Sequence, residues 1–265
     1  MNYLIIFLIS IATSTASALV GLGGGLMLIP FILLIFALPV KVVAGTMLFA
    51  MVPYTVVATI RNLKAGYVHM RIGLIMEIGS ILGVILGANL TTILPNFLLK
   101  IFFVGIVLYL MFTLRIPRDS PYNYVARVFL VLNRFPPFVM ANPSDNSRLS
   151  ASALITVGLV AGVFSGMLGI GGGFLKTPVL IVGVGLNPKI AVGTALFMIF
   201  LTSLFGTITH GILDHINYPI ALAITAGMMI GAYLGTSILK AQPSQRIKKF
   251  IFYAMLLAGI LTFFR

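Results

Sequence analysis

Residues 21–30 read GLGGGLMLIP, and 148 positions later residues 169–178 read GIGGGFLKTP. The same offset, without a gap, aligns further residues of the two halves, namely Lys41 with Lys189, Gly45-Thr46 with Gly193-Thr194, and Pro95 with Pro243. A single register that holds over about eighty residues indicates an internal repeat rather than chance similarity. The chain is therefore predicted to consist of two homologous halves.

The composition predicts a helical membrane protein. Hydrophobic residues make up 60% of the 265 residues and charged residues only 8%, whereas a soluble domain carries about a quarter charged residues. Several apolar runs approach or exceed the roughly 20 residues that a helix needs to cross a bilayer, and they lack the alternation of a membrane barrel. The expected helical segments are 3–20, 26–37, 43–60, 72–93, 98–114, 151–168, 174–185, 190–209, 217–239 and 248–264.

A polar stretch rich in proline and arginine divides the chain. It separates a first transmembrane repeat (1–114) from a second (151–265), and the stretch itself (115–150) is a linker. The apolar middle of the linker, residues 124–132, is predicted to lie on the membrane surface as a short amphipathic helix. The expected fold class is an all-α polytopic membrane protein with two inverted repeats. Each repeat has a glycine-rich broken helical hairpin followed by three transmembrane helices.

The distribution of the basic residues, which give a net charge of +13, predicts the topology. If the glycine motifs break the hairpins, each repeat crosses the membrane an odd number of times. Thirteen basic residues then fall on the linker side and three on the other, Lys41, Lys100 and Arg265. The positive-inside rule places the linker in the cytoplasm and both termini outside, and it accounts for the basic charge without a nucleic-acid partner. Repeats inverted in this way are typical of secondary transporters.

The three consecutive glycines in each motif favour an anion site. A half-helix that begins at Leu26 or Phe174 would direct its positive N-terminal end into the protein, where an anion can bind without a charged side chain. Close helix packing is the competing interpretation. Because the motif occurs twice, we expect an anion site formed by Gly23, Gly24, Gly25, Gly171, Gly172 and Gly173. Other glycines, at four-residue spacing, predict helix packing alone: Gly79, Gly83, Gly87, Gly227, Gly231 and Gly235.

Lys176 replaces the apolar Leu28 of the first copy. A lysine inside a membrane segment is costly and usually functional, although its long side chain could instead reach an interface. We expect Lys176 and the adjacent Thr177 to contact the anion. Thr46 and Thr194 follow glycines at the starts of the next helices, where their hydroxyls can either cap N–H groups or contact the anion.

Two further residues are candidates for proton coupling. Glu77 is either a coupling carboxylate in its apolar helix or a headgroup-zone residue paired with Arg71 or Lys64. His210 clusters with Asp214 and His215 in an outside-facing loop, which is either a proton-sensitive outer vestibule or a plain polar loop. These three residues are too few and too exposed for a metal site. No convergent catalytic set and no cofactor motif is present, so an enzyme is not expected.

The motif Gly-x-Gly-Gly-Gly-x-x-x-x-Pro, followed by Gly-Thr and present twice, resembles that of the TauE/SafE family of sulfite exporter-like permeases. The resemblance covers both halves and implies an inner-membrane exporter of a small anion such as sulfite or an organosulfonate. The expected partners are this anion and the lipid bilayer, and a homodimer is one assembly considered. A channel-like anion pore, or a non-transport assembly factor on the same scaffold, are the alternatives.

Overall fold

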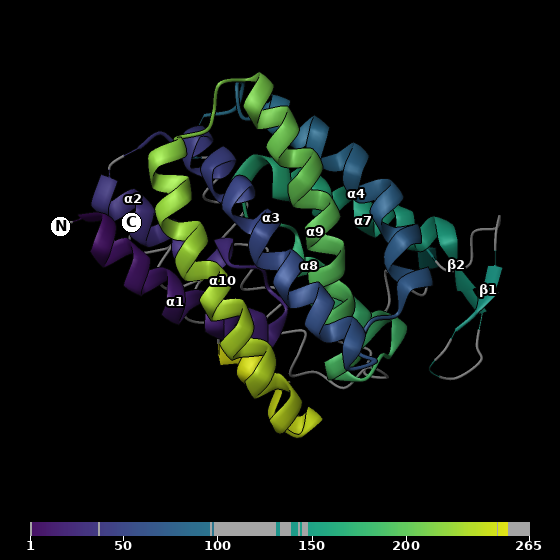
Figure 1. Ribbon diagram of the computed structural model, residues 1–265. Coiled ribbons are helices and arrows are strands. Elements are labelled where there is room, and N and C mark those ends of the chain that lie inside the picture. Colours follow the sequence, from purple (N-terminus) through teal and green to yellow (C-terminus); the bar gives the residue numbers. More distant parts are fainter. Residues whose placement is uncertain are drawn as a thin grey trace.

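The structure is a computed structural model that describes residues 2–36, 38–95, 97, 131–132, 139–142, 144, 148–247 and 249–253. Most of the described residues are helical (Figure 1). In chain order the elements are α1 (Asn2–Val20), α2 (Gly25–Phe36), α3 (Val40–Lys64), α4 (Met70–Leu90), β1 (Val139–Ala141), β2 (Arg148–Ser150), α7 (Ala151–Leu168), α8 (Gly173–Pro178), the π-helical segment η1 (Val179–Val184), α9 (Pro188–Ile212) and α10 (Tyr218–Ala241).

Six of the described helices are long and apolar enough to cross a membrane. They are α1, α3, α4, α7, α9 and α10, while α2 and the run α8–η1 are shorter. The chain is therefore an all-α polytopic membrane protein, as the sequence predicts. The predicted helices 98–114 and 248–264 and the linker helix 124–132 lie outside the described residues, except for residues 131–132 and 249–253.

Glycines end α1 and α7 at the predicted breaks. Gly21 and Gly23 have φ angles of 71° and 77°, and their equivalents Gly169 and Gly171 have φ angles of 72° and 75°. These are left-handed conformations that favour glycine, because glycine has no Cβ to clash with the backbone. The two repeats then diverge, since α2 is a regular helix whereas α8 continues after Pro178 as a π-helical segment.

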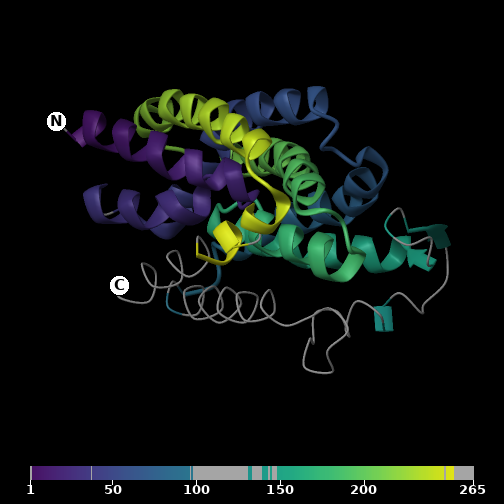
Figure 2. The same ribbon diagram turned by 90° about the horizontal axis from the view of Figure 1, so that it is seen from below.

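The first long helix of each repeat packs against a helix of the other repeat. α1 lies along α10 and, in the equivalent arrangement, α7 lies along α4 (Figures 1 and 2). A Cβ atom at Gly79, Gly83 or Gly87 would clash with carbonyl oxygens of α7, and a Cβ atom at the equivalent glycines of α10 would clash with α1. The prediction that these glycines allow close helix packing is confirmed.

The equivalent helices α3 and α9 lie side by side between these two pairs. At one end, Lys189 near the start of α9 lies over the ring of Tyr67, which follows the end of α3, with 5.5 Å from Nζ to the ring centroid. At the other end, a Cβ at Gly45 near the start of α3 would clash with the carbonyl oxygen of His215, which follows α9. α3 and α9 therefore run in opposite directions.

One element was not expected from the sequence. Near the end of the predicted linker, β1 and β2 form a short antiparallel pair in which Met140 lies opposite Leu149. The side chain of Asn142, just after β1, donates to the carbonyl oxygen of Val184 across 3.0 Å. This bond ties the hairpin to the end of η1.

Candidate functional site

The two glycine motifs lie against each other. A Cβ at Gly25 would lie 2.5 Å from the carbonyl oxygen of Gly169, and a Cβ at Gly173 would lie 2.5 Å from the carbonyl oxygen of Gly21. Thr177 also links the motifs, because its hydroxyl donates to the carbonyl oxygen of Gly21 across 2.7 Å. The two motifs are thus adjacent in space, although Gly24 faces Met228 and Gly172 faces Ala161 and Lys176 rather than the other motif.

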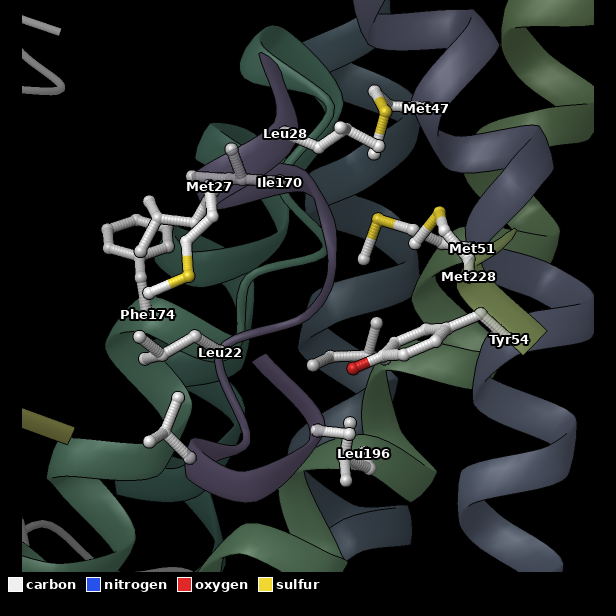
Figure 3. Packing of buried hydrophobic residues seen from close by; sticks show 14 of the residues in the cluster. Leu22, Met27, Leu28, Met47, Met51, Tyr54, Ile170, Phe174, Leu196 and Met228 are labelled. Carbon is white, nitrogen blue, oxygen red and sulfur yellow. The ribbon is translucent and has the colours of Figure 1, made fainter. Parts of the chain in front are cut away.

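Apolar side chains fill the space between the motifs. A Cβ at Gly23 would lie 2.8 Å from Cε of Met51, and a Cβ at Gly171 would clash with the same methyl group. Ile199, which is the repeat equivalent of Met51, contacts Gly171 and Gly173 in the same way. Figure 3 shows Met51 beside Met228, facing the motifs. In this conformation the centre is closed, and an anion can lie between the motifs only if these side chains move.

A buried ion pair lies next to the second motif. Lys176 on α8 is fully buried and pairs with the carboxylate of Glu77 on α4. Lys176 Nζ also donates to Thr202 Oγ1 on α9 across 2.6 Å, and that hydroxyl donates to the other carboxylate oxygen of Glu77 across 2.7 Å. Three helices thus meet at one hydrogen-bonded cluster, which we call the Lys176–Glu77–Thr202 cluster.

This cluster corrects two interpretations. Glu77 is 1% exposed and binds Lys176, so it does not pair with Arg71 or Lys64. Lys176 is 0% exposed, so its side chain does not extend to an interface. Its charge is already balanced, because a buried lysine and carboxylate in contact are neutral as a pair. The sequence alone does not connect Lys176 with Glu77, because the two residues are 99 positions apart.

Lys176 reaches this pair by folding back along the glycine motif. A Cβ at Gly172, whose φ is 74°, would lie 3.3 Å from Cε of Lys176. Gly172 therefore leaves room for the lysine stem. The symmetry-related position has no such cluster, because the equivalents of Lys176 and Thr202 are Leu28 and Tyr54 in the first repeat, and the equivalent of Glu77 is Thr225 in the second.

Thr46 and Thr194 join the repeats. The hydroxyl of Thr46 accepts from the backbone N–H of Asn217, and that of Thr194 accepts from the N–H of His69, each across 2.9 Å. Asn217 and His69 are the residues that cap α10 and α4. Each threonine therefore holds the start of a helix in the other repeat. The Thr46 hydroxyl also donates to the carbonyl oxygen of Val42 across 2.6 Å.

His210 is buried and bonded rather than exposed in a loop. It is 0% exposed, its Nε2 lies 2.9 Å from the carbonyl oxygen of Gly166, and its Nδ1 lies 3.3 Å from Nδ1 of His215. Because a carbonyl oxygen only accepts, Nε2 of His210 carries a proton. Nδ1 of the neutral ring then accepts from His215. The expectation of an exposed polar loop is wrong for these two histidines, since His215 is also buried.

His215 lies outside the membrane-spanning helices. Burial and, to a smaller extent, the charge of Lys41 lower the pKa of His215, while Asp214 opposes this effect. Among the described residues no group of three or more histidine, cysteine, aspartate or glutamate side chains could hold a metal ion.

Six buried polar atoms have no hydrogen-bond partner among the described residues, and they follow the repeat. They belong to Ser17 and its equivalent Ser165, Thr59 and its equivalent Thr207, Tyr54, and Asn62. Tyr54 and Asn62 are the equivalents of Thr202 and His210. Buried polar groups normally have hydrogen-bond partners. Unpartnered polar atoms at equivalent positions of both repeats are therefore unusual.

Sequence reasoning missed these positions although a signal was present. Ser17/Ser165 and Thr59/Thr207 are identical polar residues at the repeat offset inside apolar helices. In Figure 3 the hydroxyl of Tyr54 points from α3 toward the side of the core that holds Leu22, in the first glycine motif. Buried hydroxyl groups therefore occur both just before the glycine motifs and on the central helices α3 and α9.

The comparison with known proteins identifies the family. The family described as Sulfite exporter TauE/SafE matches residues 6–262, nearly the whole chain. The chain belongs to the TauE/SafE family. It is thus a membrane transporter or permease and not an enzyme.

Relatives of this TauE/SafE chain include two from Bacillus subtilis. "Probable membrane transporter protein YunE" is 26% identical over 271 residues, covering 98% of this chain and 96% of the relative. "Probable membrane transporter protein YdhB" is 24% identical over 261 residues, covering 98% and 100%. An Arabidopsis thaliana protein, "Sulfite exporter TauE/SafE family protein 3", is 31% identical over 85 residues, which cover 32% of this chain and 18% of the relative. No solved structure matches the chain.

Proposed function

We propose that the protein is a secondary transporter, working as an exporter, of a small sulfur-containing anion such as sulfite or an organosulfonate. The observation that carries the proposal is the Lys176–Glu77–Thr202 cluster beside the second glycine motif. Ionisable residues inside a membrane protein are costly and usually mark a transport pathway. The names of the family and of the Arabidopsis relative both point to sulfite.

The available donors suit an oxyanion. Lys176 supplies an ammonium group, and Thr202 supplies a hydroxyl in contact with it. The hydroxyls of Tyr54, Ser17 and Ser165 are buried and unpartnered, so they can donate without breaking an existing bond. Sulfite and sulfonate groups present several oxygen acceptors on one atom, and a ring of such donors would replace their hydration shell.

The closed centre favours a carrier over an open pore. Met51 and Ile199 occupy equivalent positions and fill the space between the two glycine motifs. α3 and α9, which carry these residues, run in opposite directions. In transporters with inverted repeats, rocking of one repeat against the other exposes a mid-membrane site to each side in turn. In this proposal the two apolar side chains separate during that movement and admit the anion.

The same proposal includes the orientation in the cell. Lys189 donates to the carbonyl oxygen of Lys240 across 3.0 Å and lies over Tyr67. Tyr67 follows the last turn of α3, which carries Arg61 and Lys64, so basic residues of both repeats gather at one end. By the positive-inside rule this end faces the cytoplasm, together with the linker, and both termini lie outside the inner membrane.

Anion binding to purified protein tests the proposal. A thermal-shift comparison of sulfite, sulfate, thiosulfate, sulfoacetate and taurine should show stabilisation by at least one sulfur-containing anion. The Lys176→Met/Glu77→Gln double variant removes both charges together and should weaken this binding by on the order of 1–3 kcal/mol, or about 5- to 150-fold. Leu28→Met, at the equivalent position of the first repeat, is the matched control. A protein stabilised by none of these anions would contradict the proposal.

A further inference from the structure

The Glu77 carboxylate is the internal counter-ion of Lys176. Both side chains are fully or almost fully buried, and Lys176 is the only charged group among the described residues that acts on Glu77. The pair as a whole is neutral. A neutral pair has no net charge left to attract an anion, so the structure shows the site in a form that an anion cannot enter without a further change.

We propose that Glu77 takes up one proton whenever the transported anion binds to Lys176, so that the anion and the proton cross the membrane together. This inference rests on the proposed function. Without the anion, ionised Glu77 neutralises Lys176. With the anion, protonated Glu77 is neutral and the anion becomes the partner of Lys176. The cluster carries no net charge in either state.

The physical reason is the cost of an uncompensated charge in a buried site. An anion that joined the existing pair would give the cluster a net charge of −1 in surroundings of low dielectric constant. Such a charge is strongly unfavourable unless a group changes its protonation state. Glu77 is the group that can do so, because its carboxylate lies directly on Lys176. The same argument favours anions with a single negative charge, since a second charge would again be left unbalanced.

Thr202 is placed to exchange its bonds in this step. Its hydroxyl now accepts from Lys176 and donates to Glu77. A protonated Glu77 has an O–H of its own, which can donate to Thr202 Oγ1. The hydroxyl proton of Thr202 is then released and can donate to the bound anion. Thus the proton that neutralises Glu77 also frees the Thr202 hydroxyl, which can donate to the anion or to the carbonyl oxygen of Met198, 3.1 Å away.

The surrounding elements offer no competing acid among the described residues. α7 and α8 pack near the cluster and carry no titratable side chain other than Lys176. On α9 the nearest one is His210, two turns beyond Thr202, and its ring is bonded to Gly166 and His215. On α4 itself Arg71 lies near the start of the helix, six positions before Glu77. The proton is therefore assigned to Glu77.

Methanesulfonate is the probe for the test, because its single charge does not change between pH 6 and pH 8. If only the fraction of protein with protonated Glu77 binds the anion, the apparent affinity of wild type falls by about tenfold per pH unit. The Lys176→Met/Glu77→Gln variant has no ionisable side chain left at the cluster, so its remaining affinity should not change over this range. Asp214→Asn, which removes an exposed carboxylate on the α9–α10 loop, should keep the wild-type dependence on pH.

A second measurement does not depend on any variant. Titration calorimetry of wild type in two buffers of different ionisation enthalpy counts the protons taken up, and about one proton per bound anion is expected. Binding of methanesulfonate that takes up no proton and is independent of pH would overturn the inference while leaving the proposed function standing. A pH dependence that persists in Lys176→Met/Glu77→Gln would also overturn it. Failure of wild type to bind any anion would overturn both.

Discussion

Replacement of Lys176 by methionine tests the energetic role of the buried pair. The substitution keeps the length and apolar stem of the side chain but leaves the Glu77 carboxylate buried and without its cation. Removal of one partner of a buried ion pair costs about 3–5 kcal/mol, because an uncompensated charge remains. Thr202 Oγ1, which lies 2.7 Å from Glu77, compensates only part of this loss.

The double variant Lys176→Met/Glu77→Gln removes both charges at once. Because its amide can still bond to Thr202, we expect most of the lost stability to return, with an interaction energy of about 2–3 kcal/mol between the two positions. The assay is thermal unfolding in detergent followed by circular dichroism. Using a shift of roughly 2–4 °C per kcal/mol, Lys176→Met should lower Tm by roughly 6–20 °C.

Leu28→Met is the control for this cycle, because it makes the same final side chain at the equivalent position of the first repeat. Exchange of leucine for methionine in a core usually costs less than about 1.5 kcal/mol. The account of the pair would be refuted if Lys176→Met were no more destabilising than Leu28→Met. It would also be refuted if the double variant were as unstable as the sum of the two single variants.

Three further predictions follow from the packing and the topology. Gly79→Ala should destabilise the protein by more than about 1 kcal/mol, because its Cβ would clash with the carbonyl oxygen of Ile155. Gly211→Ala is the control, because its Cβ would have no neighbouring atom nearer than 3.7 Å, and it should be neutral or stabilising by up to about 1 kcal/mol in the same unfolding assay. Thr46→Val and Thr194→Val should each cost about 1–3 kcal/mol, since each leaves the N–H of a helix-capping residue unpaired, and equal stability of both variants to wild type would contradict this. The chain has no cysteine, and Lys64 and Ile212 are at equivalent positions of the two repeats. If the repeats are inverted, a membrane-impermeant thiol reagent added outside should modify the Ile212→Cys variant and spare the Lys64→Cys variant. Labelling of both variants from the same side would exclude inversion.

The helices and the repeat could be predicted because their signals are local or periodic. Runs of apolar residues set the spans, and the glycine triplets set the breaks at Gly21 and Gly169. The gap-free offset of 148 positions identified which residues would be equivalent. The glycines at four-residue spacing revealed the packing faces, since four positions bring residues to one side of a helix.

The residues that form the candidate site were harder to predict from the sequence, because the site depends on contacts between distant segments. Nothing in the sequence near Glu77 indicates Lys176, which lies 99 positions away on another helix. Thr46 and Thr194 looked like caps of their own helices but hold residues of the other repeat. His210 looked like a loop residue because the helix α9 extends three residues beyond the expected end at 209. Tertiary packing thus decides the partners of Glu77 and of the two threonines, whereas the error at His210 came from a misplaced helix end.

Counterflow of labelled sulfite in proteoliposomes tests the central claim most directly. Vesicles that contain the wild-type protein and unlabelled sulfite inside, placed in labelled sulfite, should accumulate label transiently above its equilibrium level, because a carrier exchanges one anion for another. Vesicles with the Lys176→Met/Glu77→Gln variant should show no such overshoot. Uptake by wild type that rises only to equilibrium and does not saturate would contradict a carrier and indicate a pore, and uptake no greater than in protein-free vesicles would contradict sulfite transport.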